Sequence, residues 1–236
     1  MSSKKTEFIN GIKAGLPIGL GYLSVSFAFG MMAVSNGIPA WAAVLISASC
    51  LTSAGQFAGL SIIAAAGGLF EVALSQLVIN LRYCLMSLSL TQKLDSGFTP
   101  LSRAAVAFGN TDEIFAVAMS RNGRVSREFM CGLISTPFCG WVFGTFLGAV
   151  SGKLLPLWLR SALGIAIYAM FIAIIIPPAK KFRPVLISSL MAAALSCIFY
   201  FVPALMAVSS GFSIIICSVV SALLCALLFP IKEEAA

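Results

Sequence analysis

Long apolar segments follow one another along almost the entire chain. Eight can be drawn, and they cover residues 14–34, 41–66, 70–92, 104–120, 129–150, 157–177, 184–206 and 211–230. Most are close to the roughly 20 residues that a helix needs to cross a bilayer. In lipid, backbone groups must be hydrogen-bonded within the protein, so such segments fold as helices. The sequence therefore predicts an all-α, polytopic transmembrane helix bundle of about 7–8 membrane segments, with residues 1–236 forming a single integral membrane domain.

Composition excludes several classes of function. Hydrophobic residues make up 60% of the 236 residues and charged residues 10%, whereas soluble domains carry about 25% charged residues. The chain contains no histidine, which excludes His-ligated metal sites and Ser-His or Cys-His catalysis. A phosphate-binding loop is missing too, because Gly152-Lys153 is followed by Leu154. We therefore expect no enzyme activity, cofactor or metal, and we attribute the net charge of +7 to topology and membrane-lipid contact rather than nucleic-acid binding.

The distribution of lysine and arginine predicts the orientation of the chain. Residues 14–34 are longer than the core of a signal peptide, so we interpret them as an uncleaved first helix. If all eight segments span and the N-terminus is inside, ten of these basic residues lie inside and four outside. If 41–66 and 104–120 both re-enter the membrane, the numbers become twelve and two. Both alternatives place the N- and C-termini in the cytoplasm.

Two of the segments are interrupted near their middle. Segment 41–66 contains the small and polar residues of 49–56, and segment 104–120 contains Gly109-Asn110-Thr111-Asp112-Glu113. Irregular backbone at membrane depth survives only where protein or a polar cavity satisfies it, and interrupted segments are typical of transporter binding sites. We predict that both helices are broken or re-entrant, with Gln56 at one break. The alternative is two continuous helices whose polar residues face neighbouring helices.

Glycines recur at every fourth position in and just after the fifth apolar segment, at Gly140, Gly144, Gly148 and Gly152. This spacing lines one face of a helix and lets a second backbone approach closely. The start of the chain repeats the pattern at Gly11, Gly15 and Gly19. The pattern predicts close helix packing, with a neighbour either inside the chain or on a second chain.

Three charged residues lie in the middle of apolar segments, and each costs at least ~2.5–3.5 kcal/mol at a helix centre. They are Arg82, Asp112 and Glu113. One cation cannot neutralise two carboxylates, so the second acid must be protonated, hydrated or paired with a cation that comes and goes. We predict that Glu113 pairs with Arg82 and that Asp112 binds a substrate ammonium or a coupling proton. The alternative is that the second acid only faces a watery vestibule.

The third apolar segment also carries a polar stripe. Gln76, Asn80, Tyr83 and Ser87 are spaced four, three and four residues apart, which places them on one face of a helix. We interpret Asn80 and Tyr83 as candidate substrate-binding residues, and Gln76 and Ser87 as partners in interhelical hydrogen bonds. Glu71 lies at the end of the same segment, and we expect it to be solvated.

Five short motifs carry a resemblance to a known family. They are G-L-P-I-G-L-G-Y (15–22), S-F-A-F-G (26–30), L-T-S-A-G-Q-F-A-G (51–59), N-L-R-Y-C-L-M-S-L-S-L (80–90) and T-D-E-I-F-A-V (111–117). With these motifs the chain resembles the AzlC family, which comprises the large subunits of bacterial branched-chain amino acid exporters. The resemblance follows the whole chain in order, and its sharp motifs lie within residues 15–117.

The resemblance implies a permease of the bacterial inner membrane that exports valine, leucine or isoleucine, and sometimes methionine, with a small membrane subunit of the AzlD type. Such a substrate is a zwitterion. Its carboxylate suits a half-helix N-terminus, such as the one expected near Ser53, Gly55 and Gln56. Its ammonium suits Asp112 or Glu113. An ion gradient, most simply of protons, would supply the energy, because the sequence has no ATP motif.

The sequence leaves other functions open. The chain can export another small amphipathic solute, or serve as a membrane scaffold whose polar residues only bind a partner. An intramembrane aspartyl protease needs aspartates on two helices, and Asp112 is the only aspartate within the apolar segments.

Overall fold

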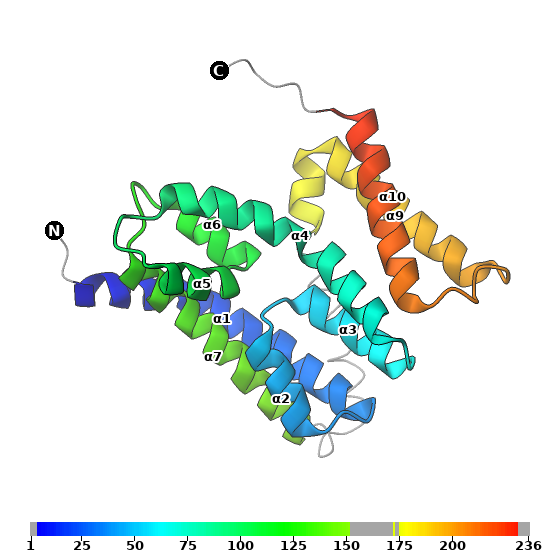
Figure 1. Ribbon diagram of the computed structural model, residues 1–236, viewed down its shortest axis with the longest axis horizontal. Helices are drawn as coiled ribbons and strands as arrows, with labels where there is room; N and C mark the ends of the chain where they lie inside the picture. Colours follow the sequence, from blue (N-terminus) through cyan, green and yellow to red (C-terminus); the bar gives the residue numbers. More distant parts are fainter. Residues whose placement is uncertain (1–3, 152–171, 173–174, 231–236) are drawn as a thin grey trace. The chain divides into compact units, whose positions relative to one another are not determined.

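The computed structural model describes residues 4–151, 172 and 175–230, and their regular structure is helical apart from one isolated bridge between Leu94 and Val125 (Figure 1). The delimited helices are α1 (Lys4–Ser35), α2 (Ala40–Ser49), α3 (Ser53–Ala64), α4 (Leu69–Lys93), α5 (Pro100–Phe108), α6 (Asp112–Ser120), α7 (Arg127–Ser151), α9 (Arg183–Phe201) and α10 (Ser210–Leu228). Most of the predicted segment 157–177 lies outside the described residues.

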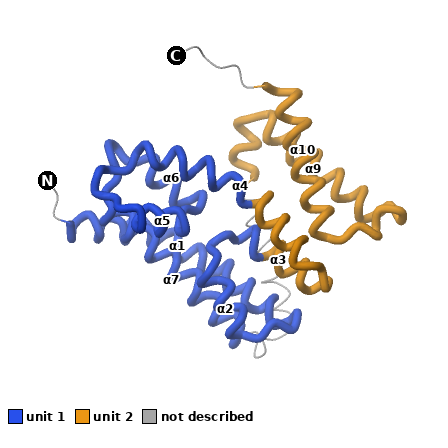
Figure 2. The backbone as a smooth tube through the Cα atoms, viewed as in Figure 1, with its two compact units in different colours: residues 1–56, 80–166 blue, residues 57–79, 167–236 orange. Residues whose placement is uncertain are grey.

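The contacts within the chain group into two compact units (Figure 2). Unit 1 comprises Met1–Gln56 and Asn80–Ala166, and unit 2 comprises Phe57–Ile79 and Ile167–Ala236. Helices α3 and α4 therefore each contribute residues to both units. The expectation of one integral membrane domain is not tested by this grouping and stays a prediction.

Five of the described helices are long and apolar enough to cross a membrane, namely α1, α4, α7, α9 and α10. Large apolar side chains on them remain exposed, among them Leu20, Leu85 and Leu227. Exposed leucine is stable in this setting because lipid tails are as apolar as leucine. The predicted class, an all-α polytopic membrane bundle, is therefore confirmed for the described residues.

Helix ends differ from the predicted segments by more than two residues at three places. α1 begins at Lys4 rather than at residue 14, because the polar N-terminal residues continue the helix. α5 begins at Pro100 rather than at residue 104, because Thr99 accepts a hydrogen bond from the Ser102 backbone N–H (3.3 Å) and proline is favoured at the first helical position. α9 ends at Phe201 rather than at residue 206. Pro203 holds the residue before it in an extended conformation.

Both predicted breaks are confirmed. α2 ends at Ser49 and α3 begins at Ser53, with Cys50 extended between them (φ −145°, ψ 121°). α5 ends at Phe108 and α6 begins at Asp112. Extended Thr111 caps α6, because its hydroxyl accepts a hydrogen bond from the Ile114 backbone N–H at 3.5 Å. The alternative of two continuous helices is wrong, because extended Cys50 interrupts the first segment and extended Thr111 interrupts the second.

α1 and α7 pack against each other through their glycines. Side chains added at these positions would meet the opposite backbone, and the closest pairs include Gly140 with Gly19, Gly144 with Leu23, and Gly148 with Phe27. Gly11 and Gly15 lie against the α7 backbone in the same way. The predicted close contact is therefore confirmed for these positions, and the neighbour is inside the chain. Gly152 lies outside the described residues.

The paired residue numbers rise together along both helices, so α1 and α7 run parallel (Figure 1). Two parallel spans must be separated by an odd number of crossings. α4 supplies one crossing, so the broken segments α2–α3 and α5–α6 either both cross the membrane or both return to their own side. With α4 taken as a crossing on its length and hydropathy, a topology in which only one of them crosses does not fit the parallel pair.

The start of α1 is tied to the loop that precedes α7. Arg121 forms an ion pair with Glu7 (Nη1 to Oε2, 2.7 Å) and donates a second hydrogen bond to Oε1 (3.0 Å). The Arg121 guanidinium also lies over the Phe129 ring, 4.1 Å from its centroid. The two-point guanidinium contact holds the N-terminal ends of α1 and α7 at the same end of unit 1.

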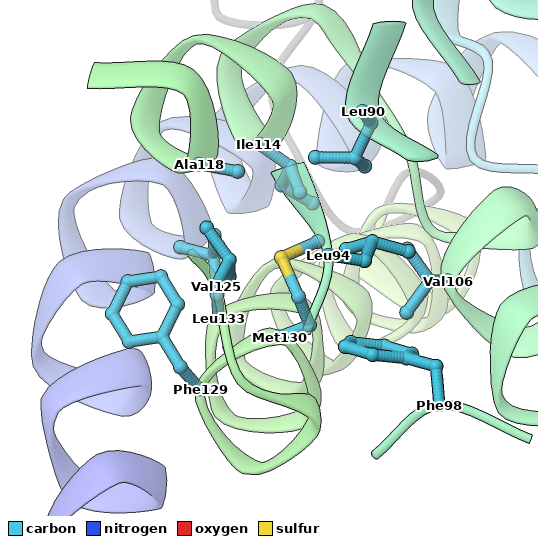
Figure 3. Close-up of a cluster of buried hydrophobic side chains, with 10 residues drawn as sticks. All are labelled: Leu90, Leu94, Phe98, Val106, Ile114, Ala118, Val125, Phe129, Met130 and Leu133. Carbon is cyan, nitrogen blue, oxygen red and sulfur yellow. The ribbon is translucent and has the colours of Figure 1, made fainter. Parts of the chain in front are cut away.

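A cluster of buried apolar side chains fills this end of unit 1 (Figure 3). Its members come from the end of α4, from α5, α6 and α7, and from the loops between them: Leu90, Leu94, Phe98, Val106, Ile114, Ala118, Val125, Phe129, Met130 and Leu133. Ala14 and Ile18 of α1 pack against it. The cluster therefore anchors both halves of the α5–α6 break to the parallel pair α1–α7.

Gly148→Ala is expected to lower the melting temperature of the purified protein in detergent. The added methyl group would collide with the Phe27 carbonyl, and overpacking of this kind costs about 1–3 kcal/mol. Gly21→Ala on α1 is the matched control, because no described atom lies within 4 Å of its added Cβ. Equal melting temperatures for the two variants would contradict the packing role.

Candidate functional site

A cavity of about 230 Å³ lies between the two helix breaks in unit 1. Its lining comes from both breaks and from the middle of α4: Ser49, Cys50, Leu51, Thr52, Asn80, Tyr83, Ala107, Phe108, Asn110 and Thr111. Liquid water occupies about 30 Å³ per molecule, whereas drug-sized ligands occupy sites of about 300–1,000 Å³. The cavity therefore suits a small organic solute.

Each break brings one helix C-terminus and one helix N-terminus to this cavity. The first N–H groups of a helix lack intrahelical partners and carry partial positive charge, and the last carbonyls carry the opposite charge. The first turn of α3 holds no acid, whereas that of α6 holds Asp112 and Glu113. The α3 end of the cavity therefore favours an anion, and the α6 end favours a cation.

The side chain of Gln56 forms hydrogen bonds across the first break. Its side-chain Nε2 donates hydrogen bonds to the backbone carbonyls of Ile46 (3.1 Å) and Cys50 (2.6 Å). Its Oε1 accepts a weaker hydrogen bond from Ser47 (3.4 Å), whose hydroxyl also lies 2.7 Å from that of Thr145 on α7. Gln56 is 4% exposed. Both amide hydrogens are thus donated to backbone carbonyls beside the break, and the Ile46 carbonyl also accepts from the Cys50 N–H. Gln56 is therefore a residue that stabilises the broken conformation.

Arg82 pairs with Asp112, not with Glu113. The Nη1 to Oδ2 distance is 2.7 Å, and Arg82 Nη2 also donates to the Tyr83 hydroxyl at 3.2 Å. The predicted pairing with Glu113 is wrong, because adjacent residues on a helix point about 100° apart and only the first of the two acids faces α4. The expectation that Arg82 neutralises one of the two acids is confirmed.

Glu113 faces α1 instead. The Tyr22 hydroxyl lies 2.5 Å from Glu113 Oε2 and 2.7 Å from Thr111 Oγ1. The Tyr22 ring packs edge-on against buried Trp141 of α7, with centroids 5.3 Å apart. The packing of its ring against Trp141 therefore fixes the position of Tyr22. Its hydroxyl connects Glu113, the acid that Arg82 does not neutralise, to Thr111, which lines the cavity.

Asn110 is a functional candidate that the sequence reasoning missed. It is 3% exposed, it lines the cavity, and its Nδ2 donates to Ser87 Oγ of α4 (3.3 Å). Its Oδ1 is buried and has no hydrogen-bond partner among the described residues. An unpaired buried acceptor is costly, so a donor on a ligand would find a vacant partner here. The sequence feature that could have identified Asn110 is its position directly before Thr111, which caps α6.

Apart from Gln56, which lies at the first break but does not line the cavity, the predicted substrate-binding residues fall into two groups. Asn80 and Tyr83 line the cavity. Ser53 and Gly55 lie in the first turn of α3, next to the lining residues of the break, and Asp112 follows Thr111 in the same way. Their roles in substrate binding stay predictions.

Glu71 in unit 2 is buried, so the expectation that it is solvated is wrong. It is 6% exposed, and its Oε1 accepts hydrogen bonds from the Ser209 hydroxyl (2.5 Å) and the Gly211 backbone N–H (2.8 Å). The start of α10 supplies these donors, and a carboxylate is stabilised there. Glu71 therefore fixes the start of α4 to the start of α10.

The model of the AzlC protein family matches residues 17–155, a range that contains both breaks, the cavity and the Arg82–Asp112 pair. Because the match covers more than half of the chain, the chain belongs to the AzlC family. The matched range ends close to the end of α7, so α9 and α10 lie beyond it.

Individual relatives agree with the family assignment. The chain is 31% identical over 196 residues to the inner membrane protein YgaZ of Escherichia coli (strain K12), and the match covers 80% of each protein. It is 33% identical over 180 residues to an uncharacterized membrane protein of Archaeoglobus fulgidus, with 75% of this chain and 78% of that protein covered. No solved structure matches the chain. The protein is thus a multi-pass membrane protein with an inner-membrane relative.

Arg82→Gln is expected to lower the melting temperature, because it leaves the Asp112 carboxylate without its cation. The second substitution Asp112→Asn should restore much of the loss, since it removes the unpaired charge. The matched control is Arg82→Gln combined with Glu113→Gln, which should give no recovery. Recovery by Glu113→Gln and not by Asp112→Asn would contradict the observed pairing.

Proposed function

We propose that the protein is a secondary active exporter of branched-chain amino acids (valine, leucine and isoleucine) that binds its substrate in the cavity between the two helix breaks. The observation that carries the proposal is the opposite electrostatic character of the two ends of one small cavity. Membership of the AzlC family supports the substrate class, since that family is linked to branched-chain amino acid export.

The carboxylate of the substrate would lie at the α3 end of the cavity. Thr52 lines the cavity there, and the first turn of α3, the end of the helix that carries partial positive charge, follows it. Gln56 stabilises this end, because its amide donates to the Ile46 and Cys50 carbonyls of the preceding segment, while the N-terminus of α3 favours an anion.

The ammonium of the substrate would lie at the α6 end. Asn110 Oδ1 offers a vacant acceptor, and the surplus negative charge of Glu113 lies behind Thr111. The apolar side chain is left with Leu51, Ala107 and Phe108, which supply most of the apolar part of the lining. A residue with a small branched side chain fits a cavity of about 230 Å³ that has two polar ends.

Export against a gradient needs an energy source, and we propose a proton gradient with Glu113 as the coupling acid. Asp112 already has a cation in Arg82. Glu113 contacts the neutral Tyr22 hydroxyl and forms no ion pair with a described residue. We therefore assign to Glu113 the proton-coupling role that the sequence predicted for Asp112.

The cellular setting forms part of the same proposal. We place the protein in the bacterial inner membrane with both termini in the cytoplasm, together with a small membrane subunit of the AzlD type. The exposed apolar surfaces of α9 and α10 in unit 2 face lipid or this subunit. A protein that exports another small zwitterion, or a scaffold that only assembles with the subunit, would differ from this proposal in the transport assay below.

Asn110→Leu is expected to raise the KM for valine in proteoliposome counterflow by about tenfold or more, because a hydrogen bond to a charged group contributes about 1.5–3 kcal/mol. Asn36→Leu is the matched control, since Asn36 lies in the exposed turn after α1 and bonds only locally to the Met32 carbonyl. Counterflow by the wild type of glycine but not of valine would overturn the substrate class. An absence of all counterflow, with intact assembly, would favour a scaffold.

A further inference from the structure

Three side chains form a continuous line from the surplus acid to the cavity. Glu113 Oε2 lies 2.5 Å from the Tyr22 hydroxyl, which lies 2.7 Å from Thr111 Oγ1, and Thr111 lines the cavity. Tyr22 carries a single hydroxyl hydrogen, so it cannot donate fully to both neighbours at once. The direction in which the hydrogens of this line point must therefore depend on whether Glu113 carries a proton.

With Glu113 ionised, the carboxylate can only accept hydrogen bonds. Tyr22 then donates to Glu113 Oε2, and Thr111 donates its hydroxyl hydrogen to the Tyr22 oxygen. Thr111 Oγ1 also accepts from the Ile114 N–H. A hydroxyl oxygen has two lone pairs, so one of them stays available on the side of the cavity. In this state Thr111 is an acceptor, as is the unpaired Asn110 Oδ1 beside it.

With Glu113 protonated, each bond in the line reverses. A hydronium ion gives its proton to Glu113 Oε2 and leaves as water, and the new O–H donates to the Tyr22 oxygen. The Tyr22 hydrogen turns to Thr111 Oγ1, which now accepts from Tyr22 and from the Ile114 N–H. Both lone pairs of Thr111 are then occupied, and its own hydrogen turns toward the cavity. Thr111 has become a donor.

We propose that Tyr22 and Thr111 relay the protonation of Glu113 to the cavity, so that a substrate ammonium is bound when Glu113 is ionised and rejected when it is protonated. This inference rests on the proposed transport function. Proton and substrate then exclude each other, which is the coupling that an exporter driven by inward proton flow requires. Tyr22 is a positioning residue in this scheme, because it touches Thr111 and not the cavity.

Other charged or titratable groups lie on the elements around Glu113. These groups are Tyr22 on α1, Arg82 and Tyr83 on α4, and Asp112 beside it on α6. The charged residues Lys4, Lys5, Glu7 and Lys13 of α1 come nine or more residues before Tyr22, and Glu71 and Lys93 of α4 are each eleven residues from Arg82. α7 carries its charged residues, Arg127 and Glu128, in its first turn. Arg82 and Asp112 neutralise each other at 2.7 Å. Tyr22 is therefore the group whose hydrogen bonding responds most directly to the protonation of Glu113.

The test is the KM for valine in counterflow by the full-length protein, with its small subunit where needed and with equal pH on both sides of the vesicle. A single competing proton raises the wild-type KM by up to about tenfold per pH unit on the acid side. Tyr22→Phe should flatten this dependence, and Tyr200→Phe, an exposed tyrosine of α9, should preserve it. Glu113→Gln should give a KM that does not vary with pH, because an amide at this position cannot titrate.

A second pair of variants keeps the relay testable if Tyr22→Phe does not fold. Thr111→Ser retains the hydroxyl and should retain the pH dependence, whereas Thr111→Val should give a high KM that no longer varies with pH. Valine counterflow with the wild-type pH dependence in Tyr22→Phe or Thr111→Val overturns the relay alone. Absence of counterflow of any amino acid by the wild type overturns the proposed function and the relay together.

Discussion

The backbone contact between α1 and α7 is the constraint on which the rest of unit 1 depends. Glycine faces such as Gly19 against Gly140 let the two helices approach until their backbones touch. The contact brings Tyr22 of α1 beside Trp141 of α7, and it places Thr145 where it can meet the first break through Ser47. The geometry of the site therefore depends on the glycine contact between α1 and α7, although these glycines are not candidate binding residues.

The two helix breaks create the cavity. They also leave backbone groups without helical partners, and the surrounding residues offset this energetic cost. Each break releases carbonyls and N–H groups in a setting without free water. Gln56 satisfies the carbonyls of the first break, and Thr111 caps the helix after the second. In the proposed function, a zwitterion would use the partial positive charge at the start of α3 and the unpaired Asn110 Oδ1.

Much of this site could be predicted from the chain, and some of it could not. The breaks, the pairing of Arg82 with an acid, and the cavity positions of Asn80 and Tyr83 follow from interrupted segments, from the cost of buried charge and from helical spacing. The choice between Asp112 and Glu113 did not follow, because it depends on the rotation of α6 between α1 and α4. Asn110 was missed since its vacant oxygen is a property of its surroundings.

The sequence by itself determined an all-helical membrane bundle, its two interrupted helices and its close glycine packing, because hydropathy, small polar residues and four-residue spacing are local properties of the chain. Only the tertiary structure decided that α1 is the partner of α7, that the two run parallel, and that Tyr22 meets Glu113 across 91 residues of sequence. Each of these depends on which helix faces which, and a helical pattern describes the face of a helix without naming the neighbour that covers it.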